Sequence, residues 1–174
     1  MIGRRSIRLR GFDYSQPGAY FLTICSAERK CTFGSIENGR VVESGLGKVI
    51  RACWIAVPQH FPSTEIDAFV IMPNHLHAIL NIKKKPAGSD GHSRENFAAP
   101  TIASVPTIVR TFKAAVARRV RETDTSISGP IWQRDYHERI IRDGKEYAET
   151  CRYIGLNPIR WELDENHPTA LEHL

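Results

Sequence analysis

The chain has 174 residues, of which 41% are hydrophobic and 25% are charged, a composition typical of one globular domain with a core of its own. No apolar run approaches the roughly 20 residues that a membrane-spanning helix needs, and the basic start lacks the apolar segment of a signal peptide. We therefore expect a cytoplasmic protein with no membrane partner. The net charge of +5 suits a polyanionic partner without requiring one.

The first third of the chain predicts strands and one helix. Residues 1–17 are polar and basic and predict an N-terminal arm. Residues 19–25 are rich in aromatic and β-branched side chains, which predicts a buried strand. The Asn-Gly pair at 38–39 lies between two short apolar runs and predicts a hairpin. A helix is expected over 44–58, with the serine at its start as the cap and a proline at its end.

The middle of the chain predicts a pair of strands, a loop and a second helix. Apolar runs at 66–72 and 75–82 are joined by Pro-Asn, and this short link predicts an antiparallel pair in the middle of the sheet. Residues 83–103 lack periodicity and are rich in Gly, Ser and Lys, so we expect a mobile loop. Residues 104–122 carry an apolar stripe at helical spacing.

The end of the chain predicts an extended stretch over 131–141, a last helix over 144–156 and a loose polar C-terminal tail over 164–174. The order of elements predicts an α+β fold, an antiparallel sheet with helices packed on it. Residues 18–163 would form its single domain.

His75-Leu76-His77 opens the second strand of the central pair. Residues i and i+2 of a strand point to the same face, so the two imidazoles would project side by side, with Leu76 turned to the opposite face. Two imidazoles on one face of a strand are a good start for a divalent-metal site. The alternative is a pair of surface histidines, and the motif alone does not decide between them.

Tyr153 lies on the flank of the last predicted helix. Tyr147, Cys151 and Ile154 share the face that would pack on the core, and at ~100° per residue Tyr153 lies off that stripe. Asn157 follows four residues later and should lie near Tyr153 on the same helix edge. The alternatives are a tyrosine at the surface that packs its ring and hydrates its hydroxyl, and an asparagine that only caps the helix end ahead of a proline.

Two motifs and their order resemble the REP-associated tyrosine transposases. Residues 72–77 read Met-Pro-Asn-His-Leu-His, residues 153–158 read Tyr-Ile-Gly-Leu-Asn-Pro, and Trp-Gln at 132–133 lies between them. The likeness runs from about residue 18 to about residue 161. These proteins are related to the single-tyrosine transposases of bacterial insertion sequences, within the HUH (His-hydrophobic-His) nuclease superfamily.

The resemblance implies a ferredoxin-like or RRM-like HUH nuclease palm, in agreement with the predicted α+β fold. It implies a metal-dependent single-stranded DNA endonuclease and strand transferase that cleaves next to hairpin elements. On the family's motifs, Tyr153 would be the nucleophile on a DNA phosphate, and the metal ligands would be His75, His77 and Asn157. The product would be a covalent 5′-phosphotyrosine and a free 3′-OH.

The implied ligands also indicate the cofactor and partner. Nitrogen and oxygen ligands without a thiolate fit Mg²⁺ or Mn²⁺, although imidazoles also accept zinc. The partner implied by the resemblance is single-stranded or hairpin DNA. Insertion-sequence relatives act as dimers with tyrosines supplied in trans, whereas the REP-associated branch acts as a monomer. We therefore expect a monomer, with a homodimer as the alternative.

Basic side chains lie outside the apolar stripe of the predicted helix at 104–122. A charge run on a helix is usually a solvated face, but here it competes with contacts to a DNA backbone, which would make binding salt-dependent. The candidate contacts are Arg110, Lys113, Arg118 and Arg119.

Other functions and other residues compete with this interpretation. The chain could be an RRM-like module that grips a hairpin DNA or RNA without chemistry, or a zinc hydrolase that uses the two histidines with a carboxylate such as Glu138. Tyr136 is the rival nucleophile and His137 a further candidate ligand. Trp132 is predicted in the core, with base stacking as its alternative.

Overall fold

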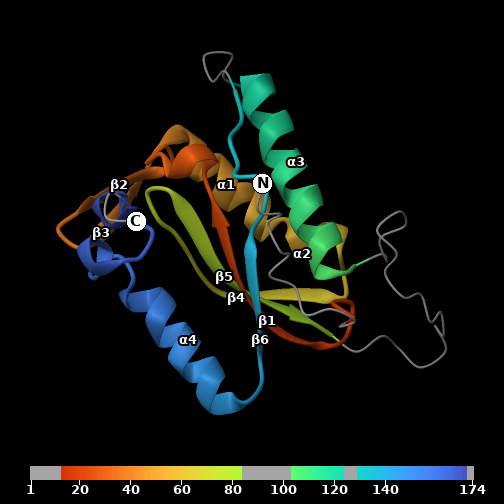
Figure 1. The fold of residues 1–174 in the computed structure, drawn as a ribbon. Helices are drawn as coiled ribbons and strands as arrows, with labels where there is room; N and C mark the ends of the chain where they lie inside the picture. Colours follow the sequence, from red (N-terminus) through yellow and green to blue (C-terminus); the bar gives the residue numbers. More distant parts are fainter. Residues whose placement is uncertain (1–12, 84–102, 124–128, 172–174) are drawn as a thin grey trace, which may run out of the picture.

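The computed structural model describes residues 13–83, 103–123 and 129–171, and its centre is a four-stranded sheet (Figure 1). The sheet order is β4-β5-β1-β6, and every neighbouring pair is antiparallel. The strands are β1 (Gly18–Cys25), β4 (Thr64–Ile71), β5 (His75–Ile82) and β6 (His137–Ile141). The predicted α+β fold is confirmed.

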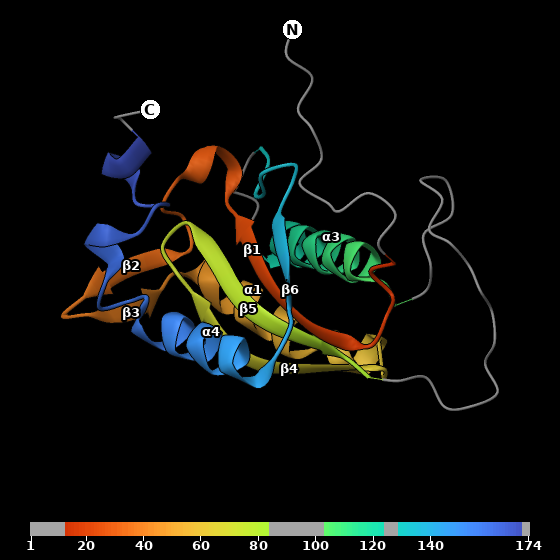
Figure 2. The same cartoon turned by 60° about the horizontal axis from the view of Figure 1, so that its bottom comes forward.

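Helices cover both faces of this sheet (Figure 2). Three of them, α1 (Gly45–Ile55), α2 (Val57–His60) and α3 (Val105–Thr123), pack over one face, and α4 (Gly144–Leu156) packs over the other. A separate hairpin is formed by β2 (Gly34–Glu37) and β3 (Arg40–Glu43). Three short 3₁₀ turns complete the described chain: η1 (Ala27–Arg29), η2 (Trp161–Leu163) and η3 (Pro168–Leu171).

Strand β5 sends alternate side chains into two different cores. Leu76, Ala78 and Leu80 face α1 and α3 and belong to the large core of the protein. Ile79 faces the other way and packs with Ile154 of α4 in a smaller core. Because side chains alternate along a strand, His75 and His77 must share the face of Ile79. The sheet therefore presents both histidines to the α4 side.

Local signals in the sequence set several boundaries. The Ser44 Oγ accepts a hydrogen bond from the Gly47 N–H at 3.1 Å, so Ser44 is the expected cap of α1. Asn38 and Gly39 have φ angles of 51° and 71°, as a two-residue hairpin turn requires. Asp143 caps α4 by accepting the Glu146 N–H at 2.8 Å.

Three expectations differ from the structure. The β4–β5 hairpin does not occupy the middle of the sheet, because β4 is an edge strand and β1 pairs with the far side of β5. Within the extended stretch expected over 131–141, only the last five residues form a strand of the sheet. The loose tail expected from residue 164 begins with buried Asp164 and Asn166, so the folded unit extends beyond residue 163.

Two further predictions lie largely outside the described residues: the N-terminal arm over 1–17, of which 1–12 are not described, and the loop over 83–103, of which 84–102 are not described. Among the helices of the described ranges, none is long and apolar enough to cross a membrane.

Two glycines of α1 provide a test of this packing. A Cβ added at Gly47 would lie 2.2 Å from the backbone oxygen of Phe33, whereas one added at Gly45 would meet no atom within 4 Å. We expect Gly47→Ala to lower the free energy of unfolding by about 1–3 kcal/mol, since a backbone oxygen cannot move aside freely. Gly45→Ala should raise it by up to ~1 kcal/mol. Urea denaturation measures both, and equal effects would contradict the close approach of α1 to Phe33.

Candidate active site

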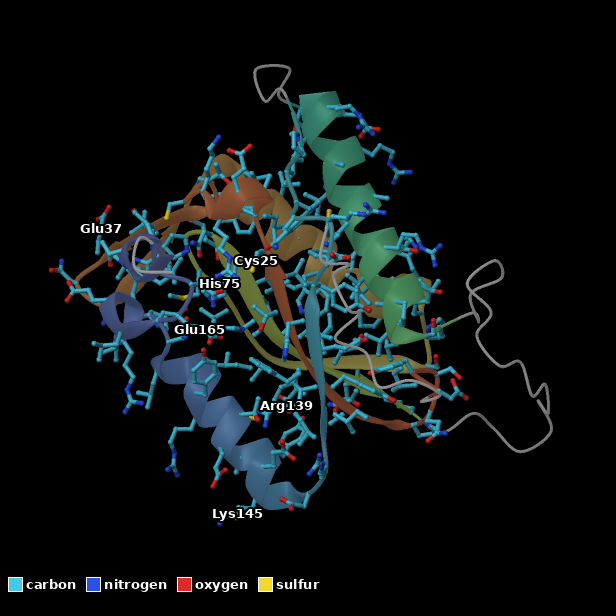
Figure 3. All side chains as sticks on the ribbon, in the orientation of Figure 1. Cys25, Glu37, His75, Arg139, Lys145 and Glu165 are labelled. Atoms are coloured by element: carbon cyan, nitrogen blue, oxygen red, sulfur yellow. The ribbon has the colours of Figure 1, made fainter. Side chains whose placement is uncertain are left out.

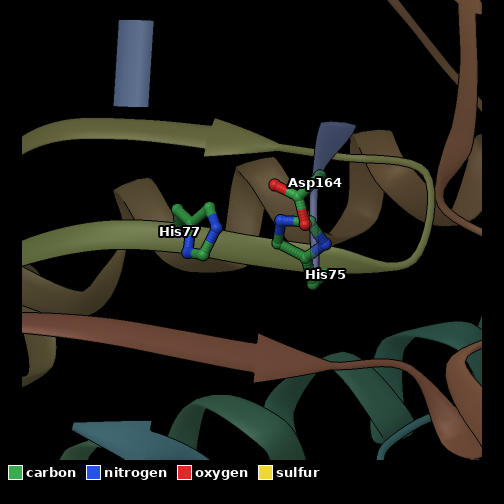
Figure 4. Close-up of side chains that lie close together, drawn as sticks. All are labelled: His75, His77 and Asp164. Atoms are coloured by element: carbon green, nitrogen blue, oxygen red, sulfur yellow. The ribbon is translucent and has the colours of Figure 1, made fainter. Parts of the chain in front are cut away.

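The two histidines of β5 are buried side by side on the α4 face of the sheet. His75 is 0% exposed and His77 is 1% exposed, and their ring centroids are 4.3 Å apart. Figure 4 shows both imidazoles projecting from β5, with the Asp164 carboxylate facing them from the C-terminal segment. They are therefore not the surface pair that the motif alone also allowed.

Helix α4 brings the Tyr153 hydroxyl to this pair. The hydroxyl lies 3.2 Å from Nε2 of His77, and the Tyr153 ring packs 5.2 Å from the His77 ring and 6.0 Å from that of Phe21. Ile154 is buried in the small core, and this anchor turns the preceding residue toward the histidines. Tyr153 itself stays 39% exposed.

Asn157 closes α4 and belongs to the same cluster. It caps the helix with φ −57° and ψ −42°, a helical conformation that the following Pro158 disfavours. Its side chain is buried, and its Nδ2 donates to Oδ2 of Asp164 at 2.7 Å. The sequence left open whether Asn157 caps the helix or faces the site, and the structure shows that it does both.

Asp164 is the residue that sequence reasoning missed. One ligand atom each from His75, His77 and Asp164 lies within 4.8 Å of the others. Its Oδ1 accepts hydrogen bonds from the Asn166 N–H at 2.7 Å and from the Asn166 Nδ2 at 3.0 Å. The only sequence signal was an Asp-x-Asn turn pattern, which occurs in many loops and carries no information about a distant strand.

The donor atoms fit a divalent cation. His75 Nε2 and Asn157 Oδ1 are buried, and neither has a hydrogen-bond partner of ordinary geometry within the described ranges, although the Asn157 side chain lies close enough to the His75 ring to act on its pKa. Buried polar atoms without a partner are costly, and each needs an explanation. A cation would accept a lone pair from both atoms. Two imidazole nitrogens, an amide oxygen and a carboxylate oxygen form a mixed set that Mg²⁺, Mn²⁺ or zinc accepts.

Burial keeps both imidazoles in the form that a metal needs. Loss of solvation lowers the pKa of His75 to about 4, with the Asp164 carboxylate partly opposing this shift. Burial likewise lowers the pKa of His77 well below its usual value, and the neighbouring His75 adds to this effect. Both rings are therefore neutral at pH 7, and a neutral imidazole is the form that ligates a metal.

The environment of Tyr153 disfavours ionisation of its phenol. Burial raises the pKa of its phenol to about 12, and the carboxylates of Asp164 and Glu165 add to this shift. Figure 3 shows His75 and Glu165 at the C-terminal end of α4, away from Lys145 at its start. At neutral pH the phenol keeps its proton, so without a nearby positive charge it is a weak nucleophile.

The predicted DNA contacts on α3 lie across the sheet from this cluster. Arg110, Arg118 and Arg119 are exposed on α3, which packs on the face opposite His75 and His77. Lys113 does not share their exposure. Its Nζ donates to the carbonyl oxygens of Gln133, Asp135 and Arg134 at 2.8, 3.2 and 3.4 Å, and burial lowers its pKa to about 8. The Lys113 ammonium therefore holds a loop of its own chain.

The residues that the sequence offered as alternative ligands or nucleophiles also lie outside the cluster. Glu138 pairs opposite Leu22, whose side chain lies in the large core, so its carboxylate is on the wrong face for a zinc site with the two histidines. Tyr136 packs against the large core beneath Lys113. His137 is exposed opposite Thr23. Trp132 contacts Phe33 and Phe112, which confirms its prediction as a core residue.

Several known proteins are similar to this chain. No protein-family model matches the chain. An uncharacterised protein of Haemophilus influenzae is 41% identical over 167 residues, which cover 93% of this chain and 92% of that protein. The REP-associated tyrosine transposase of Escherichia coli is 24% identical over 149 residues, 84% of this chain and 70% of that one. A solved structure of a REP-associated tyrosine transposase bound to a REP hairpin matches with a TM-score of 0.59 at 22% identity, covering 91% of this chain and 74% of that chain.

The chain has an α+β fold similar to that of a REP-associated tyrosine transposase, and in it a tyrosine lies beside two buried histidines. The chain belongs to one family with the Haemophilus influenzae protein. It is a relative of the REP-associated tyrosine transposases, as its motifs had indicated.

The lowered histidine pKa values predict how stability depends on pH. Between about pH 6.5 and about pH 4 the unfolded chain takes up protons on its histidines that the folded, neutral His75 and His77 do not. The unfolded state then binds more protons, so the free energy of unfolding should fall as the pH is lowered through this range. Urea denaturation across the range measures the slope.

His75→Gln should flatten this slope. The matched control is His60→Gln, because His60 lies exposed at the end of α2. An equal change of slope in both variants would contradict the assignment to the buried pair.

Proposed function

We propose that the protein is a metal-dependent single-stranded DNA endonuclease and strand transferase that cleaves next to hairpin elements through a covalent 5′-phosphotyrosine. The observation that carries this proposal is the Tyr153 hydroxyl 3.2 Å from His77 Nε2, beside two neutral imidazoles and two buried oxygen donors. The similarity of the chain to REP-associated tyrosine transposases supports the same reaction class.

Tyr153 is the proposed nucleophile. Its phenolic oxygen attacks a backbone phosphorus and loses its proton, the bond from phosphorus to the 3′-oxygen breaks, and that oxygen takes up a proton as a free 3′-OH. The new tyrosyl phosphodiester conserves the energy of the broken bond, so a second 3′-OH can attack it and rejoin strands without ATP. With one such tyrosine, each site holds one covalent strand at a time.

His75, His77 and Asn157 are the proposed metal ligands, and Asp164 is a fourth candidate because its carboxylate completes the cluster. A divalent cation bound there, Mg²⁺ or Mn²⁺, would neutralise charge on the phosphate and lower the pKa of a nearby phenol. The ligand side chains would hold that charge close to Tyr153.

The proposed partner is single-stranded or hairpin DNA. The related solved structure holds a REP hairpin, and an excess of basic side chains suits a nucleic-acid backbone. Exposed Arg110, Arg118 and Arg119 are proposed to contact this backbone from α3, without Lys113. Action as a monomer in the cytoplasm stays a prediction.

A cleavage assay tests the nucleophile. Labelled single-stranded oligonucleotides with hairpins from the source genome are incubated with Mn²⁺ or Mg²⁺ and separated on a denaturing gel. We expect a slowly migrating protein–DNA adduct that needs the metal and disappears in Tyr153→Phe, because the Tyr153 hydroxyl lies beside His77 in the cluster. Tyr136→Phe is the matched control and should keep the adduct, since this ring packs on the other side of the sheet.

Cleavage without an adduct in Tyr153→Phe would make water the nucleophile and overturn the mechanism. A second candidate function is a module that binds hairpins without chemistry. The raised pKa of Tyr153 favours it, because a phenol that keeps its proton is a weak nucleophile in the absence of a cation. Wild-type protein that binds the hairpins but forms neither cut nor adduct with any metal would establish that module instead.

Salt dependence tests the contacts on α3. If Arg118 neutralises one phosphate of duplex DNA, Arg118→Ala should lower the slope of log K against log salt by about 0.9. Lys145→Ala is the matched control, because Lys145 is exposed at the start of α4 away from α3. Equal slopes for Arg118→Ala and wild type would show that Arg118 does not contact the DNA backbone.

A further inference from the structure

We propose that Asn74 is a positioning residue of the metal centre, which fixes the tautomer of His75 so that Nε2 carries the lone pair. The inference rests on the metal-binding part of the proposed function and adds a residue to which neither the motif nor the ligand cluster gives a role. In the sequence, Asn74 belongs to a Pro-Asn turn and to the motif at 72–77, neither of which assigns it a role of its own. In the structure its side chain is 0% exposed and faces three separate segments of the chain.

Two backbone carbonyls decide which way the Asn74 amide points. Its Nδ2 donates to the carbonyl oxygen of Asn166 at 2.7 Å and to that of Arg29 at 3.0 Å. A flipped amide would place Oδ1 against both of these oxygens, where no hydrogen could separate them. Oδ1 must therefore point the other way, and there it lies 2.9 Å from Nδ1 of His75.

This orientation of the Asn74 amide determines which ring nitrogen of His75 carries the proton. An amide oxygen can only accept, so His75 Nδ1 must be the donor and must carry the ring proton. The lone pair of the neutral ring is then on Nε2, which is the buried atom without a partner in the described part of the chain. For His77 the contact at Nδ1 does not decide the tautomer, because this atom lies 3.0 Å from the Thr23 hydroxyl, which can donate or accept.

The two carbonyls are themselves held in place. Glu28 and Arg29 have φ angles of 54° and 53°, a left-handed conformation that costs non-glycine residues energy and is often found at functional sites. Arg29 Nη1 donates to the Asn166 Oδ1 at 2.9 Å, which ties the two segments to each other. The backbone oxygen of Asn74 accepts from Ser26 N–H at 2.8 Å. Outer hydrogen bonds of this kind commonly orient ligating histidines.

The direct test is the protonation of His75 in the metal-free, full-length protein, read from the ring ¹⁵N shifts and long-range couplings in NMR. We expect the proton on Nδ1 in the wild type. A proton on Nε2 would overturn the proposal whatever happens to DNA cleavage. The measurement contains no DNA, so failure of the Tyr153 adduct and failure of this inference are seen separately.

Metal affinity separates positioning from mere packing. By titration calorimetry with Mn²⁺, Asn74→Ala should bind about 10–100-fold more weakly than wild type, the usual effect of losing an outer partner of a ligating histidine. Asn74→Asp keeps an acceptor opposite Nδ1 and should recover part of that loss, although it repels the two carbonyls. Equal losses in Asn74→Ala and Asn74→Asp would overturn the tautomer role.

The matched control is Asn81→Ala on the same strand. Asn81 donates from its Nδ2 to the Tyr147 hydroxyl at 3.1 Å, away from the metal cluster, so its loss should leave Mn²⁺ affinity unchanged. An equal loss in Asn81→Ala would assign the effect to strand stability instead of Asn74.

Discussion

The register of β5 is the constraint on which the site depends. This strand is paired on both edges, with β1 and β4, and it is buried on both faces. A slip by one residue would move Leu76, Ala78 and Leu80 out of the large core and put the histidines into it. The apolar core on one face therefore fixes the imidazoles on the other, and no interaction between the histidines themselves is needed to place them.

The second constraint on the site is the packing of α4 on the sheet. Ile154 packs with Phe21, Ile79 and Ile141, and this anchor sets the rotation of the helix about its axis. The neighbouring positions follow from helical geometry, so Tyr153 and Asn157 reach the cluster together. A nucleophile and a ligand on one rigid helix keep a constant separation, which suits a reaction that depends on positioning.

Without a cation, the electrostatics of the site are unfavourable. Burial keeps the imidazoles neutral and raises the pKa of Tyr153, an effect to which the Asp164 carboxylate adds, while His75 Nε2 and Asn157 Oδ1 have no hydrogen-bond partner in the described part of the chain. A cation bound by these two atoms would satisfy both of them and would favour the ionised form of the Tyr153 phenol. The arrangement is thus costly as a purely structural core and coherent as a metal centre.

The sequence by itself determined the α+β class, the hairpin, the helix caps and the pairing of His75 with His77, because caps, turns and strand alternation are local rules. It also indicated Tyr153 and Asn157, through helical spacing and family motifs. Only the tertiary structure decided that Lys113 holds its own loop, that Glu138 faces the other way, that Asp164 reaches the histidines, and that Asn166 reaches Asn74. These depend on contacts between segments far apart in the chain, for which a short polar turn such as Asp-x-Asn carries no local signal.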